Sequence, residues 1–290
     1  MRTRVIRYLE RLRKGLVRRA YRLVGIDISA PRPRQLRGGP LQGRALLIDP
    51  DSAIEYQSKI TEGSYDHFFY EALEESGGIA DARIWDVGAH VGYHTLAFAA
   101  LVGPRGRVVA FEPNPYNAER IQQNLELNPD LSERIVLMAC ALSNNDGETP
   151  FVFSPELASG RSSGSYLEGA VRPEPPSSYT EDHFKTMTVE TAKADTLLLE
   201  KRVPQPDVIK IDVEGAEHFV LQGAKDLLSH HCPLLLVEVH NITMMFHVQK
   251  ILFDLGYDIQ MLDAEHTSLS RCFILAERRS RPEASNTRKC

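Results

Sequence analysis

The sequence predicts an α/β fold built on a doubly wound, mostly parallel sheet, and two observations support this. Short apolar runs alternate with helical patterns between residues 82 and 276, as they do in βαβ units. One such unit contains a glycine turn at residues 86–92 (DVGAHVG), and the strand after it ends in Glu112. Such a turn lets the backbone approach a ligand closely, and a terminal carboxylate can accept hydrogen bonds from ribose hydroxyls. This unit is therefore expected to hold a nucleoside.

The composition indicates a soluble, folded chain. Its 290 residues suffice for one large domain or two small ones, and 42% of them are hydrophobic, enough for a substantial core. No apolar run approaches the ~20 residues that span a bilayer, and the N-terminus does not resemble a signal peptide. The four cysteines lack CxxC spacing, which favours a reducing compartment and argues against structural zinc. We therefore expect a cytoplasmic protein and assign no metal ligands, although a divalent metal that assists carboxylates stays open as an alternative.

The net charge of −5 conceals a strongly basic N-terminal segment. Residues 1–44 hold twelve Arg and one Lys against two acids, a net charge of +11, which leaves −16 for the remainder. Apolar residues recur there at three- and four-residue steps, as on an amphipathic helix: Val5, Leu9, Leu12, Leu16, Ala20 and Leu23.

Two interpretations of this helix stay open. Residues 1–24 could contact an anionic membrane surface, on the inner face of the membrane, or the apolar stripe could pack on the domain. A nucleic-acid arm is a weaker alternative, because no aromatic platform or further basic groove follows, and we predict no nucleic-acid partner.

Composition also divides the chain. Prolines and glycines between residues 31 and 40 indicate a linker, so residues 1–40 are interpreted as the basic helix and its linker. Residues 41–276 then form the α/β domain, and the polar residues 277–290 are expected to be a disordered tail.

Apolar periodicity and caps predict the elements before residue 150. Strands are expected at residues 45–48, 82–85, 107–111 and 135–140, and helices at residues 66–76, 93–101 and 114–127. The last of these helices begins at Asn114 and Pro115, residue types that favour the N-cap and the first helical position. Residues 60–65 lie in the chain where they could cover a bound ligand.

Turn-rich segments separate the elements after residue 150. Short strands are expected at residues 151–153 and 186–191, with a mobile loop over residues 154–180 and Asp195 as the cap of a helix at residues 196–201. Further strands at residues 208–211 and 233–239 precede helices at residues 214–228 and 243–255. A terminal antiparallel pair, residues 257–262 and 271–276, completes a seven-stranded sheet.

Carboxylates gather at the ends of these strands, where an open α/β sheet binds its ligands. They are Asp86, Glu112, Asp212, Glu214 and Glu238. This concentration of negative charge would repel the pyrophosphate of a dinucleotide but suits a cationic sulfonium. The glycine spacing is also DxGxxxG rather than the dinucleotide pattern GxGxxG. The sequence therefore favours S-adenosylmethionine over a nicotinamide cofactor.

Four stretches resemble the FkbM family of S-adenosylmethionine-dependent methyltransferases, in the family's order and at similar spacing. They are IWDVGAHVGYHT (84–95), VVAFEPNPYNAERIQQNLELN (108–128), ALSNNDGE (141–148) and PDVIKIDVEGAEHFVLQGA (206–224). The resemblance covers about residues 80 to 262 and implies a Rossmann-like methyltransferase sheet. It also implies O-methylation of a hydroxyl on a sugar, glycan or secondary metabolite. The sequence departs from the family at His90, where Asn is usual, and at His94, which is usually aromatic.

The resemblance assigns roles by position. The turn residues Asp86, Gly88, Ala89, His90 and Gly92 would surround the methionine end of the cofactor. Glu112 would bind the ribose, with Asn114 beside it, and Ser143 would lie at the adenine. Asp212 and Glu214 would face the reacting centre, together with His240. We expect Asp212 and His240 to be catalytic, because an imidazole oriented by a carboxylate can take the proton of a hydroxyl.

Other interpretations remain open. His240 could serve only the start of the next helix, through its neighbour Asn241. Glu238 could be a paired core residue, and Glu214 and Glu217 could lie in a first helical turn, which favours acids. At the level of function, the alternatives are a nicotinamide-dependent oxidoreductase and a non-catalytic, nucleoside-binding, membrane-associated protein. The expected partner is a small-molecule or carbohydrate acceptor, and the oligomeric state is not predicted.

Overall fold

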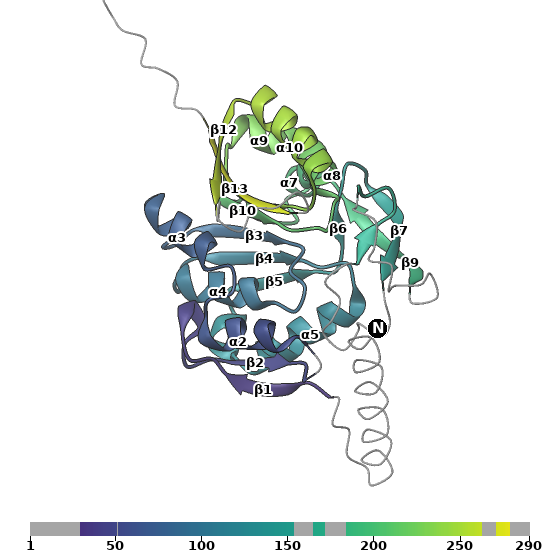
Figure 1. The fold of residues 1–290 in the computed structure, drawn as a ribbon. Coiled ribbons are helices and arrows are strands. Elements are labelled where there is room, and N and C mark those ends of the chain that lie inside the picture. Colours follow the sequence, from purple (N-terminus) through teal and green to yellow (C-terminus); the bar gives the residue numbers. More distant parts are fainter. Residues whose placement is uncertain (1–29, 51, 154–164, 172–183, 263–270, 279–290) are drawn as a thin grey trace, which may run out of the picture.

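The computed structural model describes residues 30–50, 52–153, 165–171, 184–262 and 271–278. Its central element is a seven-stranded sheet with the strand order β12-β13-β11-β10-β3-β4-β5 (Figure 1). The strands are β3 (Arg83–Val87), β4 (Arg107–Phe111), β5 (Ile135–Met138), β10 (Val208–Ile211), β11 (Leu234–Val239), β12 (Tyr257–Leu262) and β13 (Cys272–Arg278). β13 is antiparallel to both of its neighbours, and the five strands from β11 to β5 are parallel. The predicted fold class and the terminal antiparallel pair are confirmed.

Helices cover both faces of this sheet. One layer holds α2 (Ile54–Glu62), α3 (His67–Glu75), α4 (Tyr93–Leu101), α5 (Pro115–Glu126) and the short α6 (Pro129–Ser132). The other holds α7 (Ala194–Leu199), α8 (Glu217–Gln222), α9 (Lys225–His230) and α10 (Ile242–Asp254). Successive strand residues enter opposite layers: Ile84 packs in the first core and Trp85 in the second. Burial on both faces explains why these strands are continuous apolar runs.

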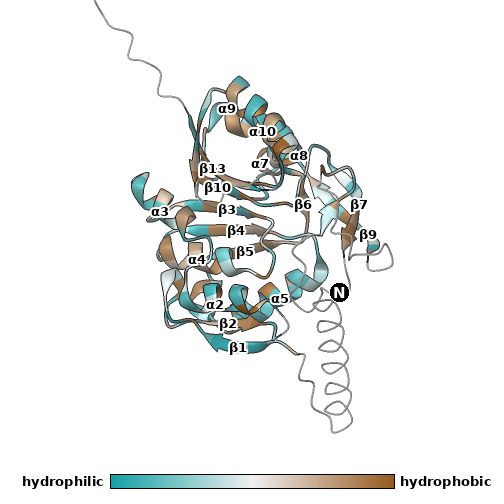
Figure 2. Cartoon of the chain, viewed as in Figure 1, coloured by the Kyte–Doolittle hydropathy of each residue, from teal (hydrophilic) through white to brown (hydrophobic). Residues whose placement is uncertain are grey.

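The segment expected to be a linker folds onto the domain instead. β1 (Arg32–Gln35) pairs antiparallel with β2 (Ala45–Ile48), and a 3-10 turn (Gly39–Leu41) lies between them. The linker prediction for residues 31–40 is therefore wrong, although β2 itself was predicted. β1 is hydrophilic along its length, whereas β4 is hydrophobic (Figure 2), and all four residues of β1 are exposed. The predicted basic helix, with its alternative membrane contact, lies outside the described residues.

A second sheet of four strands lies beside the carboxyl ends of the central strands (Figure 1). Its order is β6-β9-β7-β8, with β6 (Ala141–Leu142), β7 (Gly147–Phe153), β8 (Tyr166–Leu167) and β9 (Lys185–Ala192). The strands predicted around Phe151 and Thr186 are confirmed, and β7 is longer than expected. β8 falls inside the predicted loop of residues 154–180, most of which lies outside the described residues.

Two predicted details in the second half of the chain are wrong. The helix expected over residues 214–228 is two helices, α8 and α9, because the chain leaves helical geometry at Ala224 (φ −117°). Asp195 does not begin its own helix, whose N-cap is Lys193. Its carboxylate instead accepts hydrogen bonds from the backbone N–H groups of Asp226 (3.0 Å) and Leu227 (2.9 Å). It therefore caps the start of α9, a helix that begins thirty residues later in the chain.

Two caps and one boundary complete the comparison. Asn114 caps α5 as predicted, accepting from the backbone of Tyr116 at 3.1 Å. Asn241 caps α10 in the same way, accepting from Met244 at 2.8 Å. β13 continues to Arg278, so the ordered domain extends two residues into the predicted tail. Among the described helices, none has the length and apolar character that a membrane span requires.

Candidate active site

A cavity of about 590 Å³ lies where the parallel strands end. This volume is in the usual range for a small-molecule site. The residues that follow the central strands line it: Gly88 after β3, Glu112 after β4, Asp212 after β10 and His240 after β11. His90 lines it as well. Five of the predicted site residues therefore meet in one cavity.

The glycine turn is required by close backbone contact with β10. Gly88 has a left-handed backbone (φ +81°), and its N–H donates to the carbonyl oxygen of Phe111 at 3.0 Å. A Cβ atom at Gly88 would lie 1.9 Å from the carbonyl oxygen of Asp212. Glycine is therefore the residue that lets the turn lie against the strand bearing Asp212.

Gly88→Ala is expected to lower the free energy of unfolding by about 1–3 kcal/mol more than Gly43→Ala. Gly43 has nearly the same backbone angle (φ +80°) but nothing within 4 Å of its Cβ position. Both variants carry the left-handed strain of about 1–2 kcal/mol, and only Gly88→Ala adds the overlap with Asp212. Urea unfolding of the two variants measures the difference. Equal losses would contradict the close contact.

Glu112 is held by the turn and by the start of α5. One oxygen accepts from the backbone N–H of His90 (2.7 Å), and the other accepts from Asn114 N–H (3.0 Å) and Asn117 Nδ2 (3.2 Å). Burial raises the pKa of Glu112 to about 7, although these hydrogen bonds lower it. A carboxylate has about four lone-pair sites, so these three donors leave about one for a ligand.

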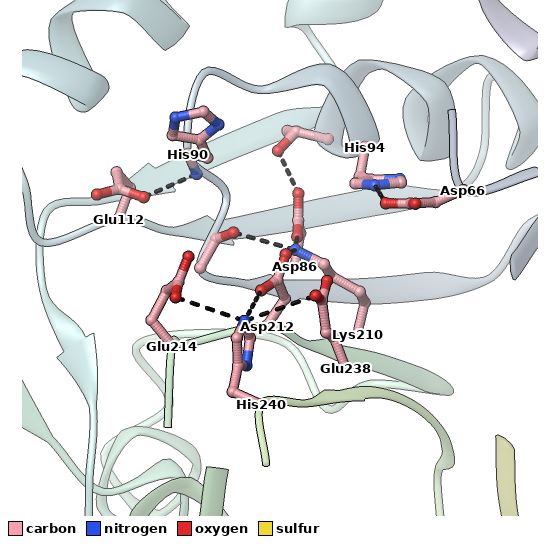
Figure 3. Close-up of polar contacts among 12 residues, drawn as sticks. Asp66, Asp86, His90, His94, Glu112, Lys210, Asp212, Glu214, Glu238 and His240 are labelled. Carbon is pink, nitrogen blue, oxygen red and sulfur yellow. Dashed lines mark hydrogen bonds and ion pairs between the residues drawn. The ribbon is translucent and has the colours of Figure 1, made fainter. Parts of the chain in front are cut away.

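Lys210 of β10 binds residues of β3 and of the turns beside the cavity, and the sequence analysis did not identify it. It is 1% exposed, and its register partner on β3 is Asp86. Its Nζ lies 3.1 Å from Asp86 Oδ1 and 3.3 Å from Asp212 Oδ2, and it donates to the carbonyl oxygen of Gly88 at 3.0 Å (Figure 3). Burial alone would lower the pKa of Lys210, but the two carboxylates raise it well above the usual value. Lys210 therefore stays charged.

His240 stands at the centre of a group of carboxylates. Its Nδ1 is 2.6 Å from Glu217 Oε1. Its Nε2 lies 3.6 Å from one oxygen of each of Asp212, Glu214 and Glu238, as Figure 3 shows. The imidazole therefore presents one nitrogen to Glu217 and the other to three carboxylates.

Burial and the neighbouring charges shift the pKa values of His240 and of these carboxylates. Burial opposes the charged imidazole, but the hydrogen bond with Glu217 and the nearby carboxylates raise the pKa of His240 to about 10. Burial, together with Asp212, raises the pKa of Glu238 to about 8. Burial also acts to raise the pKa of Asp212, yet Lys210 and His240 hold it below its usual value. Asp212 is therefore ionised at neutral pH, whereas Glu238 is mostly protonated.

The other predicted site residues lie behind the cavity wall. Asp86 is fully buried and accepts from Thr95 Oγ1 at 2.6 Å, in addition to its ion pair with Lys210. The N–H of Ala89 donates to Phe111, and the Cβ position of Gly92 lies 3.2 Å from Ile121. Asn114 is the cap of α5, and Ser143 Oγ contacts Asn145 Oδ1 at 3.3 Å.

Several cavity residues had no signal in the sequence beyond their types. Examples are Tyr56 and Lys59 of α2, Tyr166 and Arg271. Tyr65 also lines the cavity, and it belongs to the segment of residues 60–65 that was expected to cover a ligand. Arg271 Nη1 lies 3.1 Å from Glu238 Oε1. The sequence could have indicated Lys210. A charged residue inside a buried strand needs a partner of opposite charge, and acids lie at or just after the ends of neighbouring strands.

A family model and several curated methyltransferases match the chain. The family model described as "Methyltransferase FkbM domain" matches residues 86–259. The hexuronic acid methyltransferase AglP of Haloferax volcanii is 30% identical over 202 residues, which cover 69% of this chain and 72% of that protein. The 2-O-methyltransferase NoeI of Sinorhizobium fredii is 29% identical over 153 residues, 51% of this chain and 60% of that protein. A solved structure, methyltransferase FkbM from Methylobacillus flagellatus, has a TM-score of 0.48 and 19% identity, covering 68% of this chain and 44% of that one.

Proposed function

Because the chain belongs to the FkbM methyltransferase family, we propose that it transfers the methyl group of S-adenosylmethionine to a hydroxyl group of a sugar or another metabolite. The observation that carries the proposal is the single cavity that contains both the nucleoside-type turn with Glu112 and the carboxylate group around His240. The relative named for a hexuronic acid supports a carbohydrate acceptor, and the relative named as a 2-O-methyltransferase supports transfer to an oxygen.

The cofactor takes the part of the cavity beside the glycine turn. Glu112 accepts a hydrogen bond from a ribose hydroxyl at its remaining lone-pair site. Burial lowers the pKa of His90 to about 4, so its imidazole is neutral, and its Nε2 has no hydrogen-bond partner among the described residues. A buried polar atom of this kind is satisfied when a ligand arrives, so His90 replaces the usual Asn as a contact to the cofactor.

The acceptor hydroxyl lies at the carboxylate group. In methyl transfer the oxygen attacks the methyl carbon from the side opposite the sulfur, so positioning supplies much of the rate. Asp212 accepts the hydroxyl proton as the new C–O bond forms, and the C–S bond breaks to leave S-adenosylhomocysteine. His240, held by Glu217, fixes the position of the Asp212 carboxylate. In this proposal Asp212 takes the role of base that the sequence analysis gave to the imidazole, and His240 becomes the positioning residue.

The alternative of a nicotinamide-dependent oxidoreductase meets an electrostatic obstacle. Glu112, Asp212, Glu214 and Glu238 all line the cavity, and a pyrophosphate would carry further negative charge into it. A non-catalytic nucleoside-binding protein is distinguished by product, because only an enzyme releases S-adenosylhomocysteine when an acceptor is added.

The affinity for S-adenosylhomocysteine is expected to fall about tenfold when the pH is lowered from 8 to 6. The ionised form of Glu112 accepts the ribose hydroxyl, and with a pKa of about 7 this form dominates at pH 8 and is the minority at pH 6. Calorimetric titration of the full chain at both pH values measures the change.

Two variants control this titration. Glu112→Gln should bind more weakly at pH 8 and show no such pH dependence, whereas Glu119→Gln, an exposed change on the neighbouring α5, should behave as the unmodified chain. Binding that is equally strong at both pH values, or unaffected by Glu112→Gln, would remove Glu112 from the cofactor site.

A further inference from the structure

We propose that Asp212, Glu238 and His240 bind a divalent cation of the kind that accepts mixed imidazole and carboxylate ligands, such as Mn²⁺. The role of this cation in holding the acceptor hydroxyl rests on the proposed function, but its binding does not. The three side chains come from the ends of two adjacent strands, β10 and β11.

The ligand atoms already converge. One donor atom from each of Asp212, Glu238 and His240 lies within 4.8 Å of the other two. Nε2 of His240 is 3.6 Å from Asp212 Oδ1 and 3.6 Å from Glu238 Oε1. A cation about 2.1–2.4 Å from each donor separates neighbouring donors by about 3.0–3.4 Å. Small side-chain movements therefore bring all three into coordination.

The imidazole is oriented from outside this group. Glu217, which is fully buried, holds Nδ1 of His240 at 2.6 Å and itself accepts from the backbone N–H of Gly215 at 3.1 Å. Cation binding displaces the proton of Nε2, while the proton shared between Nδ1 and Glu217 remains, so the lone pair of Nε2 is then directed at Asp212 and Glu238. A carboxylate on the far ring nitrogen is the usual companion of a metal-bound histidine.

The charges and positions of the side chains around Nε2 of His240 also favour a divalent cation. Lys210 contacts the Oδ2 atom of Asp212, so Oδ1, the atom nearest His240, remains on the side of the imidazole. Glu214 also lies 3.6 Å from Nε2 and is placed to be a fourth ligand. One imidazole with several carboxylates suits Mn²⁺ or Zn²⁺ better than Ca²⁺, whose ligands are oxygens.

The cation would serve the acceptor directly. A hydroxyl bound to a divalent cation loses its proton more readily, and it is fixed in place beside the methyl donor. Asp212 and His240 would then act on the acceptor oxygen through the ion that they hold. The competing interpretation is that His240 is a charged imidazolium, paired with the same carboxylates and binding no metal.

Mn²⁺ titration of the full chain separates these interpretations. The chain is treated with EDTA, desalted and titrated with MnCl₂, and the free ion is followed by electron paramagnetic resonance. We expect one saturable site per chain. Pulsed resonance should detect a directly coordinated nitrogen in the unmodified chain, a readout that needs no variant.

Matched variants locate the site. His240→Ala should abolish the nitrogen signal and weaken Mn²⁺ binding at least tenfold, and Glu217→Gln, which keeps the ligands but loses the orienting charge, should weaken it about 10–100-fold. Asp254→Asn, an exposed change on α10, should leave it unchanged. Thermal melts check that each variant is folded.

The outcomes also distinguish this inference from the proposed function. S-adenosylhomocysteine binding without saturable Mn²⁺ binding at millimolar metal, or Mn²⁺ binding without a coordinated nitrogen, would overturn the cation site alone. Mn²⁺ binding at His240 without any S-adenosylhomocysteine binding would keep the cation site and overturn the methyltransferase proposal.

Discussion

Asp212→Asn is expected to lower the turnover number by about 10²–10⁴-fold while the affinity for S-adenosylhomocysteine changes only a few-fold. The amide keeps the shape of the side chain but cannot accept the hydroxyl proton. Lys210 and His240 also hold the pKa of Asp212 below its usual value, so this carboxylate is ionised and able to accept the proton. Release of S-adenosylhomocysteine in the presence of an acceptor measures turnover, and calorimetry measures affinity.

The matched control is Asp254→Asn, which makes the same chemical change at a side chain on the exposed surface of α10. Its turnover should equal that of the unmodified chain. Full turnover in Asp212→Asn would remove this residue from the mechanism, and a parallel loss of cofactor affinity would show that it acts in binding instead. His240→Ala, tested in the same way, should also lose turnover.

Lys210→Met is expected to lower the free energy of unfolding by about 3–5 kcal/mol, the largest loss of stability that we predict. Met retains the apolar stem but leaves Asp86, which is fully buried, without its cationic partner. The substitution also removes the ion pair of Lys210 with Asp212 and its hydrogen bond to the carbonyl oxygen of Gly88. Urea unfolding can be followed through the single tryptophan, Trp85, which is buried on the adjacent strand.

Lys250→Met provides the comparison for a surface ion pair. Lys250 lies 2.7 Å from Asp254, but its side chain is 76% exposed, and such pairs contribute at most about 1 kcal/mol. If the two variants lost similar amounts of stability, the buried ion pairs of Lys210 would not hold the strand ends together as we describe.

Four of the parallel strands (β3, β4, β10 and β11) could be predicted because each is a mostly apolar, mostly buried run that a polar residue or glycine follows. β5 is only partly buried and was predicted from its apolar residues alone. Strand neighbours could not be predicted in the same way. The contact between Lys210 and Asp86 depends on β10 lying beside β3, although more than a hundred residues separate the two strands. Local sequence therefore identified Asp86 as a site residue but not the lysine that binds it.

The errors have physical causes as well. Residues 31–40 contain three prolines, which usually exclude a strand. Only Pro33 lies within β1, and the strand tolerates it because β1 pairs only with β2 among the described strands, so one edge needs no hydrogen bonds. For Asp195, the local rule identified the right kind of role, a cap, but the wrong helix, since α9 reaches that carboxylate only through tertiary folding.

The sequence left two roles open for His240, catalysis or the start of the next helix, and these roles belong to different residues. Asn241 caps α10, and His240 turns instead toward Glu217 and the cavity acids. The sequence analysis placed the acids of this group at neighbouring strand ends, but it could not show that Glu217 of α8 holds the imidazole of His240, because that contact forms only in the folded chain. The spacing of these residues along the chain follows no metal-binding motif, so the sequence assigned no metal ligands and left a divalent metal beside the carboxylates only as an alternative.

Equilibrium dialysis of labelled S-adenosylmethionine against the full chain tests the central claim most directly, because it requires no knowledge of the acceptor. We predict that each chain retains one molecule of the donor, that S-adenosylhomocysteine displaces it, and that NADH does not. A chain that retains no donor, or that releases it to NADH as readily as to S-adenosylhomocysteine, would contradict the account.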